Sequence, residues 1–188
     1  LGSTLPITTG AFLYIYGKMK DDNRMVGASF AVFQAGLITV TYISILKGLT
    51  GRAHPDPNDA PLDRGDVSRR FNFGLVRGGI YRGWPSGHVG GTMAVASSLS
   101  NYYPEKTWLK ALTYFWAGYT MASVSIYHKG TMHWFSDAIA AGFMTYSIGK
   151  SVGNFYRNSI SENKDHEKFR LWPVQIDDYS GVFLSLSF

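Results

Sequence analysis

Cysteine is absent from the 188-residue sequence, and this absence narrows the chemistry open to the chain. It excludes disulfides, thiolate metal sites and a cysteine nucleophile. Charged residues are few, at 16%, and we find no internal repeat and no low-complexity segment. Six arginines lie between positions 52 and 82, but four aspartates share that stretch. It therefore resembles a mixed-charge loop, and we expect no nucleic-acid partner.

The residues that are abundant indicate one folded domain. Apolar residues make up 45% and aromatic residues 15% of the chain, which excludes a disordered composition. A length of 188 residues suits a single domain with a sizeable core, over residues 1–188. The sequence begins with Leu1 rather than methionine, so we expect it to be cut from a longer protein.

Apolar stretches separated by turn residues predict an all-α fold. We expect a bundle of about five or six helices, with helices over residues 4–19, 26–46, 87–103, 106–127 and 132–156. A long loop is expected over residues 47–81. In the tail, residues 157–188, the segment 182–188 alternates apolar and polar residues, which predicts a short β strand or hairpin.

Two of the predicted helices could meet lipid. Residues 26–46 run 21 positions without a charge, and residues 111–127 run 17. The first is long enough to cross a bilayer, although small and polar residues interrupt it. A soluble helical bundle therefore remains an alternative to a membrane protein at this point.

If consecutive helices run antiparallel, three polar clusters meet at one end of the bundle. Short connections favour that topology. It brings together the end of the second helix with its following residues (47–55), the start of the third (85–88), and the turn between the fourth and fifth (125–137). This convergence predicts an active site at that end.

The residue types in these clusters suit phosphate chemistry. His133 and Asp137 are four apart, so on a helix they share a face, and the carboxylate can orient a nucleophilic or basic imidazole. Ser86 and Gly87 at a helix start can bind an anion. His88 can donate a proton, and Lys47 can stabilise an oxyanion.

Each of these features also has a purely structural interpretation. The pair of His133 and Asp137 also suits a helix N-terminus, Ser86 also suits a simple N-cap, and Lys47 is favoured at any helix C-terminus. Only the combination points to a catalytic site. Three of the histidines, His88, His128 and His133, show no repeated ligand spacing, so we expect no metal site.

In these residues the sequence resembles the type 2 phosphatidic-acid phosphatase superfamily, which includes class A acid phosphatases and vanadium haloperoxidases. That family carries lysine, six residues and Arg-Pro; then Pro-Ser-Gly-His; then Ser-Arg, five residues, histidine, three residues and aspartate. Lys47 is followed after six residues by His54-Pro55, and residues 85–88 match the second motif in full. His133 and Asp137 match the end of the third motif.

The sequence departs from the family at both motif arginines. Histidine stands at position 54, and tyrosine stands at position 127. In the family these arginines grip phosphate oxygens, which tyrosine and histidine do less well. His54, Arg52 and His128 are candidates to bind phosphate in their place. A divergent, inactive phosphate-binding member is therefore an alternative.

The resemblance implies a metal-independent phosphatase without a cofactor. Lys47, His54, Ser86 and the Gly87 amide would hold the phosphate. His133, oriented by Asp137, would attack phosphorus, and His88 would protonate the leaving oxygen. A phosphohistidine intermediate would follow, which water then hydrolyses.

The apolar helices favour a phosphorylated lipid as substrate and a membrane as partner. By the resemblance, we expect a bacterial cell-envelope protein whose active site faces the periplasm or the exterior. A soluble periplasmic acid phosphatase acting on small phosphoesters is the first alternative. A haloperoxidase is disfavoured, because the arginines that hold vanadate are the ones missing. The sequence does not choose a particular substrate or oligomeric state.

Overall fold

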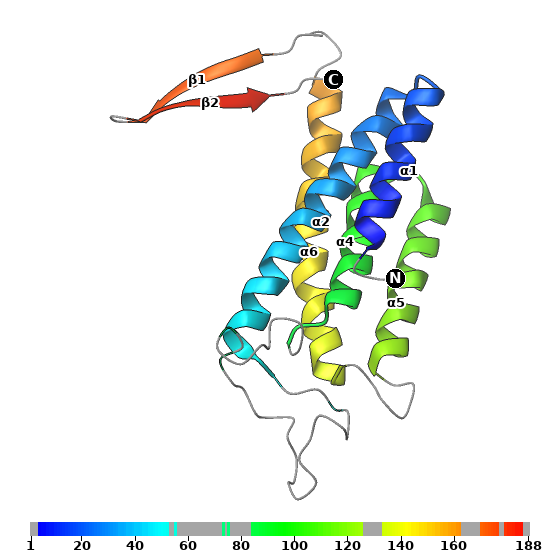
Figure 1. Ribbon diagram of the computed structural model, residues 1–188. Coiled ribbons are helices and arrows are strands. Elements are labelled where there is room, and N and C mark those ends of the chain that lie inside the picture. The colour runs from blue at the N-terminus through cyan, green and yellow to red at the C-terminus, as the bar shows by residue number, and fades with distance from the viewer. Residues whose placement is uncertain are drawn as a thin grey trace, which may run out of the picture.

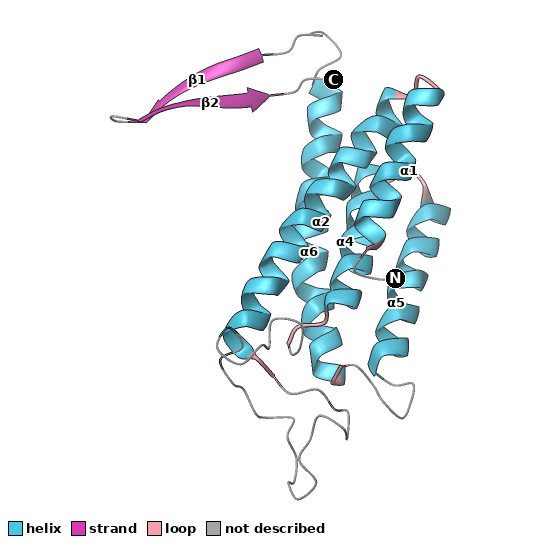
Figure 2. Ribbon diagram, in the orientation of Figure 1, coloured by secondary structure: helices cyan, strands magenta, loops and turns pink. Residues whose placement is uncertain are grey.

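The computed structural model describes residues 4–52, 55, 73, 75, 84–125, 133–162, 170–176 and 179–185. Within these residues the chain forms five helices and a β-hairpin (Figure 1 and Figure 2). The helices are α1 (Leu5–Met19), α2 (Asn23–Thr50), α4 (Gly87–Tyr102), α5 (Thr107–Ser125) and α6 (Phe135–Glu162). Strands β1 (Arg170–Ile176) and β2 (Tyr179–Ser185) are antiparallel. The predicted helical bundle with a C-terminal hairpin is confirmed.

The sequence signals at the helix ends explain where the helices begin. Pro6 lies in the first turn of α1, where a missing N–H leaves no hydrogen bond unmade. The side chain of Asp22 caps α2 by accepting a hydrogen bond of 2.9 Å from the Met25 N–H. This cap places the start of α2 at Asn23, three residues before the predicted start.

Helix α4 is the centre of the bundle and packs against the other four helices. Most of its side chains are small and buried, so neighbouring backbones approach it closely. The main core cluster joins α2, α4 and α6 through ten buried side chains: Ala28, Ala31, Val32, Ala35, Ala94, Val95, Leu99, Tyr102, Tyr103 and Val152. The alanines and serines of α4 are thus the residues that let α6 and α2 close around it.

The closest helix packing is between α4 and α6, and glycines on α6 make it possible. A Cβ atom built on Gly149 would lie 2.6 Å from the carbonyl oxygen of Ala94 and 3.0 Å from the backbone nitrogen of Ser98. A backbone atom cannot move aside as a flexible side chain can. The two helices can therefore keep this separation only with glycine at position 149.

We expect Gly149→Ala to destabilise the fold by about 1–3 kcal/mol, because the methyl group overpacks the α4–α6 contact. Gly118→Ala on α5 is the matched control, since nothing lies within 4 Å of a Cβ built there. That substitution should stabilise by up to ~1 kcal/mol through helix propensity alone. Denaturant unfolding of both variants measures the difference. Equal stability of the two would show that the α4–α6 distance does not depend on this glycine.

In the part of the chain that is described, one helix, α2, is long and apolar enough to cross a membrane. Of its most apolar window, 39% is buried within the bundle, and the other residues of the window are partly or fully exposed. The other charge-free stretch, residues 111–127, lies in α5 as far as residue 125. Among the described residues, α5 is not apolar enough to count as a candidate membrane-spanning helix.

The ends of the helices meet as predicted. In Figure 1, the C-terminal ends of α2 and α5 and the N-terminal ends of α4 and α6 all lie at the lower end of the bundle. Two hydrogen bonds tie these ends together: the Ser86 N–H donates to the carbonyl oxygen of Asp137 at 3.1 Å, and the His133 N–H donates to that of Val124 at 3.3 Å. The predicted convergence of the polar clusters is confirmed for these residues.

Candidate active site

The end of α2 brings Lys47 and the following residues to the site. Gly51 adopts a left-handed conformation, with φ of 50°, and its N–H caps the helix by donating to the carbonyl oxygen of Lys47 at 2.9 Å. The Thr50 hydroxyl donates to the carbonyl oxygen of Trp84 at 2.9 Å, which links α2 to the segment before α4. The chain therefore turns at Gly51, and Arg52 lies against the start of α6.

Ser86 begins α4 and is completely buried. Its Oγ accepts a long hydrogen bond of 3.5 Å from the Val89 N–H, so the N-cap interpretation of this serine is confirmed. A Cβ atom built on the next residue, Gly87, would meet nothing within 4 Å. Among the described residues, therefore, the side of Gly87 to which a Cβ would point is open, and the helix dipole favours an anion near this end of α4.

His133 lies just before α6, rather than on it. The helix begins at Phe135, so the prediction that His133 and Asp137 share a helical face is wrong in detail. The two side chains still meet: His133 Nδ1 is 3.5 Å from Asp137 Oδ2. That distance is within ion-pair range but longer than an ordinary hydrogen bond. Only 4% of His133 is exposed, so the imidazole is held inside the bundle end.

Asp137 is the most connected side chain of the site. It is 1% exposed, and its Oδ2 atom accepts a hydrogen bond of 3.0 Å from the Trp134 N–H. Its Oδ1 atom pairs with the Arg52 guanidinium, which also donates to the Ser136 hydroxyl at 2.8 Å. The Arg52 guanidinium and the Trp134 N–H thus engage both carboxylate oxygens, and Oδ2 is also the atom that faces His133.

The pair of Arg52 and Asp137 is a feature that the sequence did not predict. Arg52 was predicted to bind phosphate, and that assignment stays a prediction; in the structure its Nη1 atom contacts Asp137 and Ser136. The guanidinium also lies over the ring of Trp134, 5.8 Å from its centroid. Arg52 and Asp137 are 85 positions apart, and no local spacing signals such a pair.

His88 lies beside His133, with ring centroids 6.5 Å apart and an angle of 61° between the ring planes. Burial lowers the pKa of His88 below its usual value, and the nearby charges of His133 and Lys47 lower it further. A lowered pKa makes the protonated imidazole a stronger acid. Burial also lowers the pKa of Lys47 below its usual value, and the Asp137 carboxylate opposes part of that shift.

The structure thus brings together Lys47, Ser86, Gly87, His88, His133, Asp137 and Arg52. His54 and His128 lie outside the described residues, as does Tyr127. Their assignment to phosphate binding, and the effect of the missing motif arginines, stay predictions.

A helical bundle that holds a buried histidine–aspartate pair beside a second histidine is a plausible framework for acid–base or nucleophilic chemistry. Comparison with models of protein families matches residues 25–161 to the PAP2 superfamily. The chain belongs to this superfamily, which confirms the resemblance seen in its motifs. Membership supports a phosphatase-type activity. Comparison with curated proteins and with solved structures gave no match.

Proposed function

We propose that the chain, as a single domain, is a metal-independent phosphatase that hydrolyses a lipid phosphate or diphosphate through a phosphohistidine. The observation that carries this proposal is the buried pair of His133 and Asp137, with His88 beside it. A carboxylate in contact with an imidazole can activate the imidazole as a nucleophile. A second titratable group close by can then protonate the leaving group.

His133 is the proposed nucleophile. Its Nδ1 atom faces Asp137, so the other ring nitrogen, Nε2, attacks phosphorus. A P–N bond forms while the P–O bond to the leaving group breaks, and His88 donates its proton to the departing oxygen. Water then attacks the phosphohistidine, His88 accepts a proton from it, and the P–N bond breaks to release phosphate.

Positive charge and N–H donors are proposed to hold the phosphate during these steps. Among the described residues of the site, Lys47 and Arg52 are basic and Asp137 is acidic, so basic side chains outnumber acidic ones where an anion is proposed to bind. The Ser86 hydroxyl and the Gly87 amide complete the proposed phosphate site, where open space adjoins Gly87. His54 and His128 are proposed to contribute from the segments that follow α2 and α5.

A lipid substrate is favoured by the outer surface of the bundle. Large apolar side chains are exposed on four of the five described helices, and examples are Leu37 on α2 at 69%, Phe115 on α5 at 71% and Phe143 on α6 at 75%. Large exposed apolar patches on a protein surface mark sites of contact with membranes or other proteins. Together with α2, this surface supports a membrane-associated enzyme, and we propose a bacterial envelope location with the site facing the periplasm or exterior.

The test is phosphate release by the purified chain in detergent, with EDTA present, from dioleoyl phosphatidic acid, a polyprenyl diphosphate and p-nitrophenyl phosphate. We expect release in EDTA and a higher kcat/KM for the lipids. Preference for p-nitrophenyl phosphate would favour the soluble acid phosphatase instead. Loss of activity with EDTA would exclude the metal-independent mechanism. If no phosphate is released from any of the three substrates, the inactive phosphate-binding alternative is supported, in which the loss of the motif arginines has abolished catalysis.

A further inference from the structure

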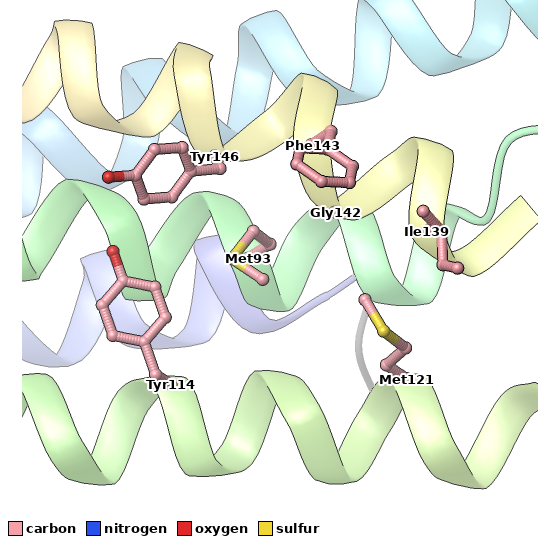
Figure 3. Close-up of a pocket in the computed structure, with 7 residues that line it drawn as sticks. All are labelled: Met93, Tyr114, Met121, Ile139, Gly142, Phe143 and Tyr146. Carbon is pink, nitrogen blue, oxygen red and sulfur yellow. The ribbon is translucent and has the colours of Figure 1, made fainter.

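An apolar groove runs along the outside of the bundle between α5 and α6, with α4 as its floor. We call this cavity, of about 440 Å³, the α5–α6 groove. In Figure 3, Met121 and Ile139 lie at one end, Met93 lies in the middle, and Tyr114 and Tyr146 lie at the other end. Helices α5 and α6 contact each other much less than either contacts α4, which leaves the groove open along its length.

One end of the groove lies next to the candidate active site. Ile139 is two residues after Asp137 on α6, and Met93 is five residues after His88 on α4, which is about 7.5 Å along a helix. Met121 packs against a small buried cluster that contains Val89, the residue after His88. One end of the groove therefore lies near the end of the bundle that holds the two histidines.

The walls of the groove suit a linear hydrocarbon chain. Two methionines line it, and their flexible thioethers adapt to an apolar ligand of variable shape. Phe143 is 75% exposed at its open side. From Ile139 to Tyr146 the groove follows α6 for seven residues, about 10 Å. The tyrosine rings, with centroids 6.4 Å apart, close the end away from the site.

A second apolar cavity, of about 540 Å³, lies between α1, α4 and α5. Its lining runs from Thr92 to Tyr103 and Lys106, at the opposite end of α4 from His88, and includes no described residue of α6, the helix that begins beside His133. It is therefore less well placed to receive a chain whose phosphate lies at His133.

We propose that the α5–α6 groove binds one linear hydrocarbon chain of the lipid whose phosphate reacts at His133. This inference rests on the proposed function, and it adds the surface that selects lipids over small phosphoesters. The phosphate would lie at the bundle end, and the chain would run from Ile139 and Met121 towards Tyr114 and Tyr146. Binding energy from the chain would then hold the phosphate in position for attack.

Gly142 offers a way to fill the groove from within. A Cβ atom built on Gly142 would lie 2.9 Å from Met121 Cε, which is the movable end of a flexible side chain. Gly142→Leu should therefore be accommodated while occupying the space proposed for the chain. Gly118→Leu on α5 is the matched control, because nothing lies within 4 Å of a Cβ built there.

The first readout is substrate preference. We expect Gly142→Leu to lower the ratio of kcat/KM for dioleoyl phosphatidic acid to that for p-nitrophenyl phosphate by about tenfold or more, since a few lost methylene contacts suffice for that change. Dihexanoyl phosphatidic acid should be affected less. Gly118→Leu should leave both rates unchanged. An unchanged ratio in Gly142→Leu, or an equal fall on both substrates, would overturn the proposal.

The second readout does not depend on catalysis, so it separates this inference from the proposed function. A phosphatidic acid with a diazirine at the end of one acyl chain is photolysed with wild type and with both leucine variants. Mass spectrometry should find label on the groove-lining segments of α5 and α6, reduced about tenfold in Gly142→Leu and retained in Gly118→Leu. Equal labelling of these segments in all three proteins would overturn the groove assignment, even if the chain proved to have no phosphatase activity.

Discussion

Replacement of His133 by alanine is expected to lower kcat/KM for phosphate release by at least about 10³-fold, because it removes the proposed nucleophile. The imidazole is buried, and its Nδ1 atom lies against Asp137. Steady-state phosphate release in EDTA measures the effect. The best lipid substrate found for the wild type should be used.

Two controls separate chemistry from folding at this position. His133→Gln keeps more of the buried volume, so its activity should fall as far as that of His133→Ala while its thermal stability falls less. Rapid quench of the wild type at alkaline pH should trap phosphate on His133, because phosphohistidine survives alkali and is lost in acid. Retention of more than a tenth of the activity in both variants would contradict a nucleophilic role.

The second large effect is expected for Asp137→Asn, which keeps the shape of the side chain and removes its charge. The buried guanidinium of Arg52 would lose its counter-ion, and one buried pair broken in this way costs about 3–5 kcal/mol. An amide group would also place its NH₂ against a donor, either Arg52 or the Trp134 N–H. The imidazole of His133 would lose the carboxylate that orients it, so kcat should fall by about 10²–10⁴.

Chemical unfolding and kcat should be measured on Asp137→Asn, on Arg52→Met and on the double variant. Removing both charges should restore part of the stability lost in Asp137→Asn, because no unpaired buried charge remains. It should not restore kcat, because His133 still lacks its carboxylate. A double variant that is no more stable than Asp137→Asn alone would show that Arg52 and Asp137 do not act as a pair.

The helices could be predicted from the sequence because each is a long apolar stretch with polar turns at both ends. Asp22 and Ser86 are N-cap residues, and both cap the helices that follow them. The meeting of four helix ends followed from the assumption that consecutive helices run antiparallel, which short connections favour. The start of α6 was predicted too early, since the Asp137 side chain accepts the Trp134 N–H and His133 remains in the turn before the helix.

The sequence did not predict which side chain pairs with Arg52, because its partner Asp137 is 85 positions away. Arg52 was assigned to phosphate because it lies near the first motif, and the structure places it on Asp137 and Ser136. Ion pairs between residues far apart in sequence depend on how the helix ends approach one another. The spacing of residues along the chain does not predict such pairs. It does not predict the α5–α6 groove either, because the groove also depends on how the helices pack.

The glycine contact between α4 and α6 has a consequence for the tuning of the reaction. His88 stands on α4 and the pair of His133 and Asp137 stands at the start of α6, so the separation of the proposed proton donor and the proposed nucleophile follows from how these two helices pack. Gly149 lies about three turns of helix from Asp137. In the proposed mechanism, a contact in the middle of the bundle therefore sets the distance over which the proton moves. Helix α5 packs less extensively against α6 than α4 does, so with the proposed groove the substrate range could change on the α5 side while that distance stays the same.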